Sequence, residues 1–135
     1  SENYIRKNYK NYSILRVFNV YGKNQPKDFF MPDIISKIKN KQKIIINKSV
    51  RDFIHVNEVT KIINFVIKRK ILTTLNVGSG RGLKLNYIVK NIGMQLNIKP
   101  HILEKLQSTK IVADITNLKS YGYKQNKNAK HFNIY

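Results

Sequence analysis

The residue types with the clearest capacity for chemistry are Arg51 and Asp52, which are adjacent and precede an apolar segment and a helix start. A guanidinium group can hold a phosphate through two parallel hydrogen bonds, so Arg51 could bind an anionic ligand. The alternative is an ion pair between Arg51 and Asp52 that ties the loop to the next strand. The dipeptide alone favours this structural alternative, because such pairs are common at protein surfaces.

A glycine-rich segment, G-S-G-R-G at 78–82, lies between an expected strand and an expected helix. A dinucleotide-binding turn needs G-x-G-x-x-G, and Leu83 occupies the position of the last glycine. The segment therefore predicts a tight connection between strand and helix without a ligand.

Other arrangements of reactive side chains are weak. The chain has 3 His and no Cys, which gives no metal-ligand spacing and predicts no metal site. His55 is expected to be a structural histidine. There is no G-x-S-x-G nucleophile motif, and the 7 Asp and Glu are dispersed. The residues thus indicate no catalytic group in this chain.

The charge is strongly positive, with 26 Lys and Arg against 7 Asp and Glu and a net charge of +19. Such a charge attracts polyanions, so a basic nucleic-acid-binding module is one alternative function. The lysines are spread from Lys7 to Lys130 rather than forming a block. Lys, Asn and Ile share AT-rich codons, so compositional bias explains the charge better, and nucleic acid is not the expected partner.

These side chains must be positioned by a globular domain. A chain of 135 residues with 41% hydrophobic residues can bury a core. No apolar run approaches the roughly 20 residues of a membrane span, and the first residues carry no signal pattern. The sequence therefore predicts no membrane partner.

Apolar periodicity predicts alternating strands and helices, and hence an α/β or α+β fold. Strands are expected at 12–21, 43–46, 53–56, 73–77 and 102–103. Helices are expected at 2–10, 28–40, 58–70, 85–96 and 113–120. Asn57 is the expected N-cap of the third helix.

The order of four segments is more specific than any one of them. They are L-R-V-F-N-V-Y-G at 15–22, F-M-P at 30–32, R-D-F-I-H-V at 51–56 and N-V-G-S-G at 76–80. This series resembles the C-terminal, substrate-side portion of the NAD-dependent epimerase/dehydratase family, the extended short-chain dehydrogenase/reductases that include UDP-glucose 4-epimerase-like enzymes. The resemblance implies an α/β fold, the C-terminal part of a Rossmann-like extended fold with a small α+β substrate-binding lobe, incomplete. It assigns 1–124 to that domain and 125–135 to a polar tail.

The resemblance also implies a substrate site. Asn19 and Arg51 would hold the diphosphate of a nucleotide-sugar, which raises the phosphate function of Arg51 above the structural one. The other residues implied are Phe18, where the sugar approaches the nicotinamide, Phe29 and Phe30 at the nucleoside, and Ile44 and Ile46 on the strand that packs on the base.

NAD is the cofactor that the resemblance implies for a complete enzyme of this family. The family's G-x-x-G-x-x-G motif and its catalytic Ser/Thr and Y-x-x-x-K lie in the first half of such an enzyme, and the resemblance gives them no counterpart here. We therefore expect a fragment that binds a nucleotide-diphosphate sugar, lacks the main NAD-binding motif and is inactive alone. The implied setting is cytoplasmic, in polysaccharide biosynthesis, with a homodimer as a possible assembly of the complete enzyme.

Three departures from the family pattern leave alternatives open. The loop at 47–50 has no Gly, Lys84 stands where a capping Ser is common, and 107–111 lacks the Arg of an R-x-G-D stretch that also touches phosphate. Lys110 could replace that Arg as a point charge. A non-functional remnant is a further alternative. The resemblance does not choose the sugar, the base, or epimerase against dehydratase or reductase chemistry.

Overall fold

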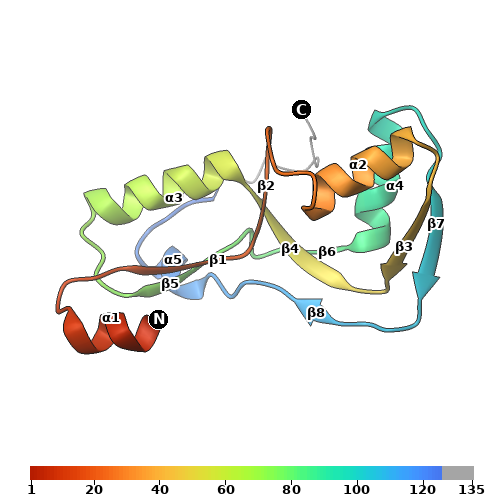
Figure 1. The fold of residues 1–135 in the computed structure, drawn as a ribbon. Helices are drawn as coiled ribbons and strands as arrows, with labels where there is room; N and C mark the ends of the chain where they lie inside the picture. Colours follow the sequence, from red (N-terminus) through yellow and green to blue (C-terminus); the bar gives the residue numbers. More distant parts are fainter. Residues whose placement is uncertain (126–135) are drawn as a thin grey trace.

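The computed structural model describes residues 1–125, in which strands and helices alternate along an elongated molecule (Figure 1). The strands are β1 (Ile14–Val17), β2 (Asn19–Tyr21), β3 (Lys43–Asn47), β4 (Val50–His55), β5 (Thr74–Val77), β6 (Gly82–Lys84), β7 (His101–Lys105) and β8 (Lys110–Ile111). The helices are α1 (Glu2–Asn8), α2 (Phe30–Lys39), α3 (Val56–Lys68), α4 (Leu85–Gln95) and α5 (Thr116–Ser120). The expected α/β class is confirmed. No helix among the described residues is long and apolar enough to cross a membrane.

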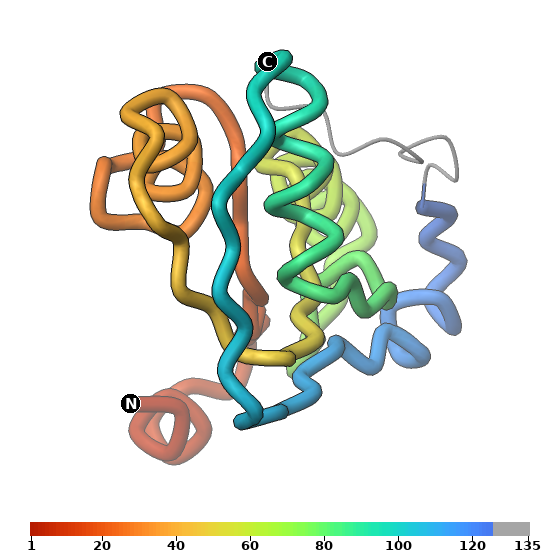
Figure 2. Tube along the Cα trace, turned by 90° about the vertical axis from the view of Figure 1, so that its right-hand side faces the viewer, coloured from red at the N-terminus to blue at the C-terminus, as the bar shows by residue number. Residues whose placement is uncertain are grey.

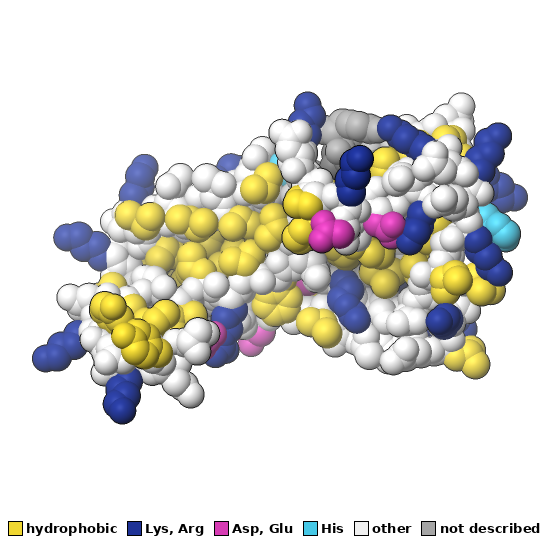
Figure 3. Space-filling view, viewed as in Figure 1, with side chains coloured by type: hydrophobic (Ala, Val, Ile, Leu, Met, Phe, Trp, Pro, Cys, Tyr) yellow, Lys and Arg dark blue, Asp and Glu magenta, His cyan; other side chains and the backbone are white. Residues whose placement is uncertain are grey.

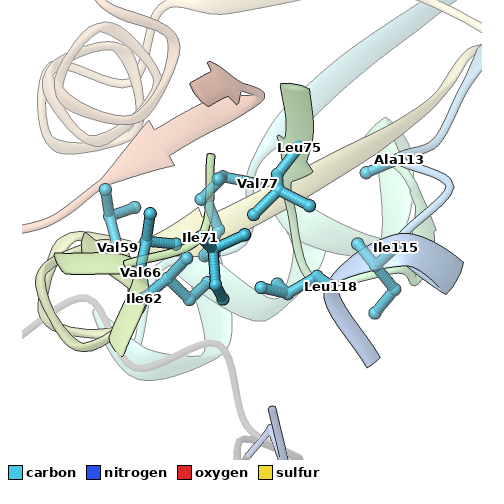
Figure 4. Close-up of a cluster of buried hydrophobic side chains, with 10 residues drawn as sticks. Val59, Ile62, Val66, Ile71, Leu75, Val77, Ala113, Ile115 and Leu118 are labelled. Atoms are coloured by element: carbon cyan, nitrogen blue, oxygen red, sulfur yellow. The ribbon is translucent and has the colours of Figure 1, made fainter. Parts of the chain in front are cut away.

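One part of the molecule is built on the parallel pair β1–β5, in which Leu15 pairs with Leu75. Leu75 and Val77 are fully buried, as alternate residues of a strand with one covered face should be. Helix α3 packs on that face through its apolar stripe, and residues near α5 close the cluster, as Figure 4 shows. This first cluster contains Ile54, Val59, Ile62, Val66, Ile71, Leu75, Val77, Ala113, Ile115 and Leu118.

The other part is built on the parallel pair β3–β7, against which α2 and α4 pack. Figure 2 shows these two strands running side by side. Pro32 lies in the first turn of α2, where its missing N–H costs no helical hydrogen bond. This second cluster contains Met31, Ile34, Ile38, Ile44, Ile46, Phe53, Ile88, Val89 and Ile92.

Strand β4 joins the two clusters. Phe53 belongs to the second cluster and its neighbour Ile54 to the first, because successive side chains of a strand face opposite sides. β4 also pairs with β2, β6 and β8. Residues of β4 are therefore held at a fixed place between the two parts of the molecule.

The predicted strand at 12–21 is wrong in one respect, because it forms two strands in different sheets. β1 pairs with β5, the backbone N–H of Phe18 still donates to Val77 O at 2.9 Å, and β2 then pairs with β4. An apolar run predicts an extended chain but not its partners, so the change of sheet at Phe18 left no signal in the sequence.

The remaining differences concern element ends. His55, not Asn57, caps α3: its side chain accepts the backbone N–H of Asn57 at 3.2 Å. α5 begins at Thr116 rather than at 113, and the short strands β6 and β8 were not predicted. Gln125, placed in the expected loose tail, donates to Gly78 O at 2.6 Å. The rest of that predicted tail, 126–135, lies outside the described residues.

Candidate functional site

The guanidinium of Arg51 is fixed by one neighbouring loop residue and by its own strand. Nη1 donates to Thr109 O at 3.1 Å and to Val50 O at 3.0 Å, and Nη2 donates to Thr109 Oγ1 at 2.7 Å. These bonds occupy three of the five N–H donors of an arginine. They leave Nε–H and the second Nη2 hydrogen, which lie together on one edge of the guanidinium.

Within residues 1–125, Arg51 makes no ion pair. Its charge is therefore not neutralised by a carboxylate. Two adjacent N–H groups on one edge match the spacing of two phosphate oxygens, which favours bidentate binding of a phosphate. Arg51 is thus a fixed cation with a free fork, meaning the two N–H donors on one edge of its guanidinium that have no partner in the described chain.

Asp52 is fully buried and does not pair with Arg51, so the ion pair that the dipeptide alone favoured is wrong. Its carboxylate instead accepts from Ser79 N at 2.8 Å, Ser79 Oγ at 2.5 Å, Gly80 N at 2.9 Å and Ala113 N at 3.1 Å. Alternation along β4 explains the separation, since adjacent side chains face opposite sides.

The glycine-rich turn is a structural connection, as the sequence predicted. The N–H groups of Ser79 and Gly80 already donate to Asp52. A phosphate-binding turn would need such donors to be free. Gly78 lies so close that an added Cβ would be 2.8 Å from Asp52 Oδ2. The turn therefore serves to anchor the buried carboxylate.

Asn19 begins β2 and is exposed. Its Nδ2 donates to the backbone oxygen of Asp52 at 2.8 Å, which orients the amide. Asn19 pairs with Phe53, and Arg51 lies two residues earlier on the same strand. Paired residues and residues two apart share a face of a sheet, so the register places Asn19 and Arg51 on one face.

The aromatic candidates lie around this ladder. Phe30 packs on Phe53, with ring centroids 5.5 Å apart. Phe29 is 49% exposed and precedes α2. Phe18, at the switch from β1 to β2, is half-buried against the first cluster. Of these rings, Phe29 is the most available to a ligand.

Ile44 and Ile46 face the core in this structure. They are 1% and 6% exposed, whereas Ile45 between them is 54% exposed. Direct contact of Ile44 and Ile46 with a ligand stays a prediction. Their evident contribution is to hold β3 in place through burial, worth about 2 kcal/mol for each side chain.

The proposed substitute cation, Lys110, pairs with Val50, whereas Arg51 pairs with Ile111. Neighbouring positions of the ladder face opposite sides, so the register does not favour a shared phosphate grip by Lys110 and Arg51. Lys84 also pairs with Val50. Its side chain makes no cap hydrogen bond to α4, in agreement with the expected loss of a capping hydroxyl.

Tyr123 and Lys127 have the Y-x-x-x-K spacing of the family's catalytic pair, which the sequence analysis did not single out. The Tyr123 hydroxyl donates to Glu58 Oε1 at 2.8 Å. Burial, and then this hydrogen bond to Glu58, raise the pKa of Tyr123. The raised pKa disfavours loss of the proton, and the hydrogen bond to Glu58 links Tyr123 to α3, which favours a structural role. Lys127 lies outside the described residues.

Neither a metal centre nor a basic stripe emerges from the described part of the chain. No group of three His, Cys, Asp or Glu side chains could hold a metal ion there. On the face drawn in Figure 3, Lys and Arg side chains are scattered over most of the surface rather than gathered on one element. The expected structural His55 is confirmed by its cap and by its edge contact with Tyr21, 5.1 Å between centroids.

Comparison with protein-family models gives a match over residues 1–78 to the model described as the NAD dependent epimerase/dehydratase family. No curated protein sequence matches the chain significantly.

Several solved structures share the fold. The UDP-N-acetylglucosamine 4-epimerase from Methanobrevibacter ruminantium M1, in complex with UDP-N-acetylmuramic acid, is 26% identical, with a TM-score of 0.77 over 94% of this chain and 45% of that one. The UDP-N-acetylglucosamine 4-epimerase from Bacillus cereus is 19% identical, with a TM-score of 0.75 over 94% and 45%. The Thermotoga maritima UDP-glucose 4-epimerase with UDP-glucose is 22% identical, with a TM-score of 0.71 over 88% and 42%. The chain therefore spans less than half the length of each of these proteins.

Proposed function

The chain belongs to the NAD-dependent epimerase/dehydratase family, and we propose that it forms the nucleotide-sugar-binding part of such an enzyme. The observation that carries the proposal is the free fork of Arg51, a cation held rigidly by Thr109 and left without a carboxylate partner in the described chain. A diphosphate is the ligand group that best matches it.

Asn19 supports the same ligand from the neighbouring strand. Its Nδ2 is partly engaged by Asp52 O, which leaves one N–H donor and the amide oxygen for a ligand. Because Asn19 and Arg51 share a face of the β2–β4 ladder, both can approach one diphosphate. Asn19 would contribute orientation and Arg51 the charge.

The remaining candidates would surround the rest of the ligand. Phe29 and Phe30 are proposed for the nucleoside, since aromatic rings stack on bases, and Phe18 for the sugar. Ile44 and Ile46 are proposed to hold the strand on which the base lies. Each of these roles is inferred from the family resemblance and from position.

When bound in a complete enzyme of this family, NAD would supply the hydride chemistry. Within the described residues the glycine-rich turn does not fit its pyrophosphate, because Asp52 already uses the N–H groups of Ser79 and Gly80. The residues of this chain are therefore proposed to bind and orient the sugar nucleotide. We propose no proton transfer by any of them.

Titration of the protein with UDP-glucose and with UDP-N-acetylglucosamine, followed by calorimetry or ligand-observed NMR, tests the proposal. Arg51→Ala should raise Kd at least about tenfold, since a hydrogen bond to a charged group contributes about 1.5–3 kcal/mol. Asn19→Ala should raise it by a smaller factor. Arg81→Ala removes the same charge from an exposed position and should change Kd less than about twofold.

Absence of binding by the unaltered protein would reject the proposal. Equal losses in Arg51→Ala and Arg81→Ala would show attraction by net charge alone. Binding of duplex DNA that weakens steeply with salt, together with no sugar-nucleotide binding, would instead favour a basic nucleic-acid module.

A further inference from the structure

The connection between β7 and β8 carries a hydroxyl group beside Arg51. Thr109, the last residue before β8, accepts the backbone N–H of Val50 on its carbonyl at 2.8 Å. Ser108 in the same connection donates to Lys48 O at 2.7 Å. These bonds fix the backbone of Thr109 next to β4, so its side chain has a defined position.

The hydrogen bonds around Thr109 Oγ1 determine where its proton goes. Oγ1 accepts from Arg51 Nη2 at 2.7 Å and lies 3.1 Å from Ser49 Oγ, where either hydroxyl could donate. Ser49 is only 2% exposed, and its Oγ already accepts the backbone N–H of Thr109 at 3.3 Å. The proton of Ser49 needs an acceptor, because an unsatisfied buried hydroxyl costs about 1–3 kcal/mol.

Thr109 Oγ1 is the acceptor available to Ser49. With Ser49 and Arg51 both donating to it, the two lone pairs of Oγ1 are occupied. The Thr109 hydroxyl hydrogen is then left without a protein acceptor within residues 1–125. Thr109 is exposed, so this hydrogen is directed to solvent or to a ligand.

We propose that the Thr109 hydroxyl donates to the diphosphate beside the free edge of Arg51, an inference that rests on the proposed function. Thr109 lies in the stretch 107–111, which has no arginine. The Thr109 hydroxyl, whose oxygen accepts from Ser49 and Arg51, is thus an uncharged donor to the diphosphate beside the Arg51 guanidinium. Because the Thr109 hydroxyl would contact the diphosphate, it should strengthen binding of nucleoside diphosphates and not of nucleosides.

Thr109→Val tests the hydroxyl, because valine has nearly the same shape and no donor. Kd for UDP-glucose should rise about fivefold to tenfold, with Thr109→Ser restoring binding to within about twofold. Uridine, which has no phosphate, should bind both variants alike. Thr60→Val makes the same replacement at an exposed residue of α3 and is the matched control.

Thr109→Val leaves the buried Ser49 hydroxyl without its acceptor, which could unfold the protein. The double variant Ser49→Ala with Thr109→Val removes that hydroxyl as well, so binding can still be measured. Ser49→Ala alone keeps the Thr109 hydroxyl but removes one of the two groups that donate to it, so Kd for UDP-glucose should rise by less than in Thr109→Val. Repeating Thr109→Val in an Arg51→Lys background separates a ligand contact from the positioning of Arg51. A direct contact predicts a further loss of at least threefold.

Unchanged binding in Thr109→Val, while Arg51→Ala loses binding, would overturn this inference and leave the proposed function intact. Loss of the Thr109 effect in the Arg51→Lys background would also overturn it, because Thr109 would then act only through Arg51. Absence of UDP-glucose binding by the unaltered protein would reject both proposals together.

Discussion

The buried carboxylate of Asp52 accepts the backbone N–H of Gly80 at 2.9 Å, across 28 residues of sequence. Asp52 accepts from Ser79 and Ala113 as well, so one side chain of β4 fixes both the glycine-rich turn and the segment before α5. Its neighbour Arg51 points away from it, toward Thr109. The two halves of the R-D dipeptide thus separate into a cation held by Thr109 and a buried anchor.

Asp52→Asn should destabilise the protein by about 2–4 kcal/mol. The two oxygens of Asp52 both receive N–H groups, so an amide nitrogen at either place faces a donor and leaves buried groups unsatisfied. Urea unfolding followed by circular dichroism measures the change. Asp114→Asn is the control, because Asp114 is an exposed carboxylate that accepts the Thr116 N–H at 2.9 Å; a loss of equal size there would contradict the special role of Asp52.

Gly80→Ala should cost more stability than Gly122→Ala. Both glycines have positive φ, +68° and +89°, which costs an alanine about 1–2 kcal/mol. A Cβ on Gly80 would also meet Ile115 Cδ1 at 2.7 Å, whereas a Cβ on Gly122 would meet nothing within 4 Å. We expect Gly80→Ala to be the more destabilising by about 1 kcal/mol in thermal or urea unfolding. Equal losses would show that Ile115 moves aside freely.

Ile44→Ala and Ile45→Ala test which face of β3 is buried. Ile44 is 1% exposed and Ile45 is 54% exposed. Truncation of the core residue should cost about 2–5 kcal/mol, and truncation of its neighbour less than about 1 kcal/mol. Comparable losses, measured by urea unfolding, would mean that β3 is shifted by one residue.

The Tyr123–Glu58 hydrogen bond should make stability fall at alkaline pH. The pKa of Tyr123 is raised, by burial first and then by Glu58, so folding favours the protonated hydroxyl. Its contribution is fully present below the unfolded-state pKa of about 10 and is lost as pH rises through the higher folded-state pKa. Tyr123→Phe should flatten the fall of Tm above about pH 10. Tyr121→Phe, which alters an exposed ring, is the control, and an unchanged slope in Tyr123→Phe would contradict the assignment.

Much of the fold could be predicted from local pattern. The stripes of α3 and α4 and the strands β3 and β5 follow directly from apolar periodicity, because a helix or strand with one buried face repeats its apolar residues at a fixed spacing. Element ends and partners could not be predicted in this way. The switch of sheet at Phe18, the cap of α3 by His55 and the short strand β8 depend on contacts with residues distant in sequence.

The sequence by itself determined the α/β class and the order of motifs that marks the family, because both are carried by residue types along the chain. It also singled out Arg51 and Asn19, but it could not say what surrounds them. Only the tertiary structure decided that Asp52 turns inward, that Ile44 and Ile46 face the core, and that Thr109 holds Arg51. The physical reason is that burial and hydrogen-bond partners across 58 residues arise from the packing of strands, which local sequence does not encode.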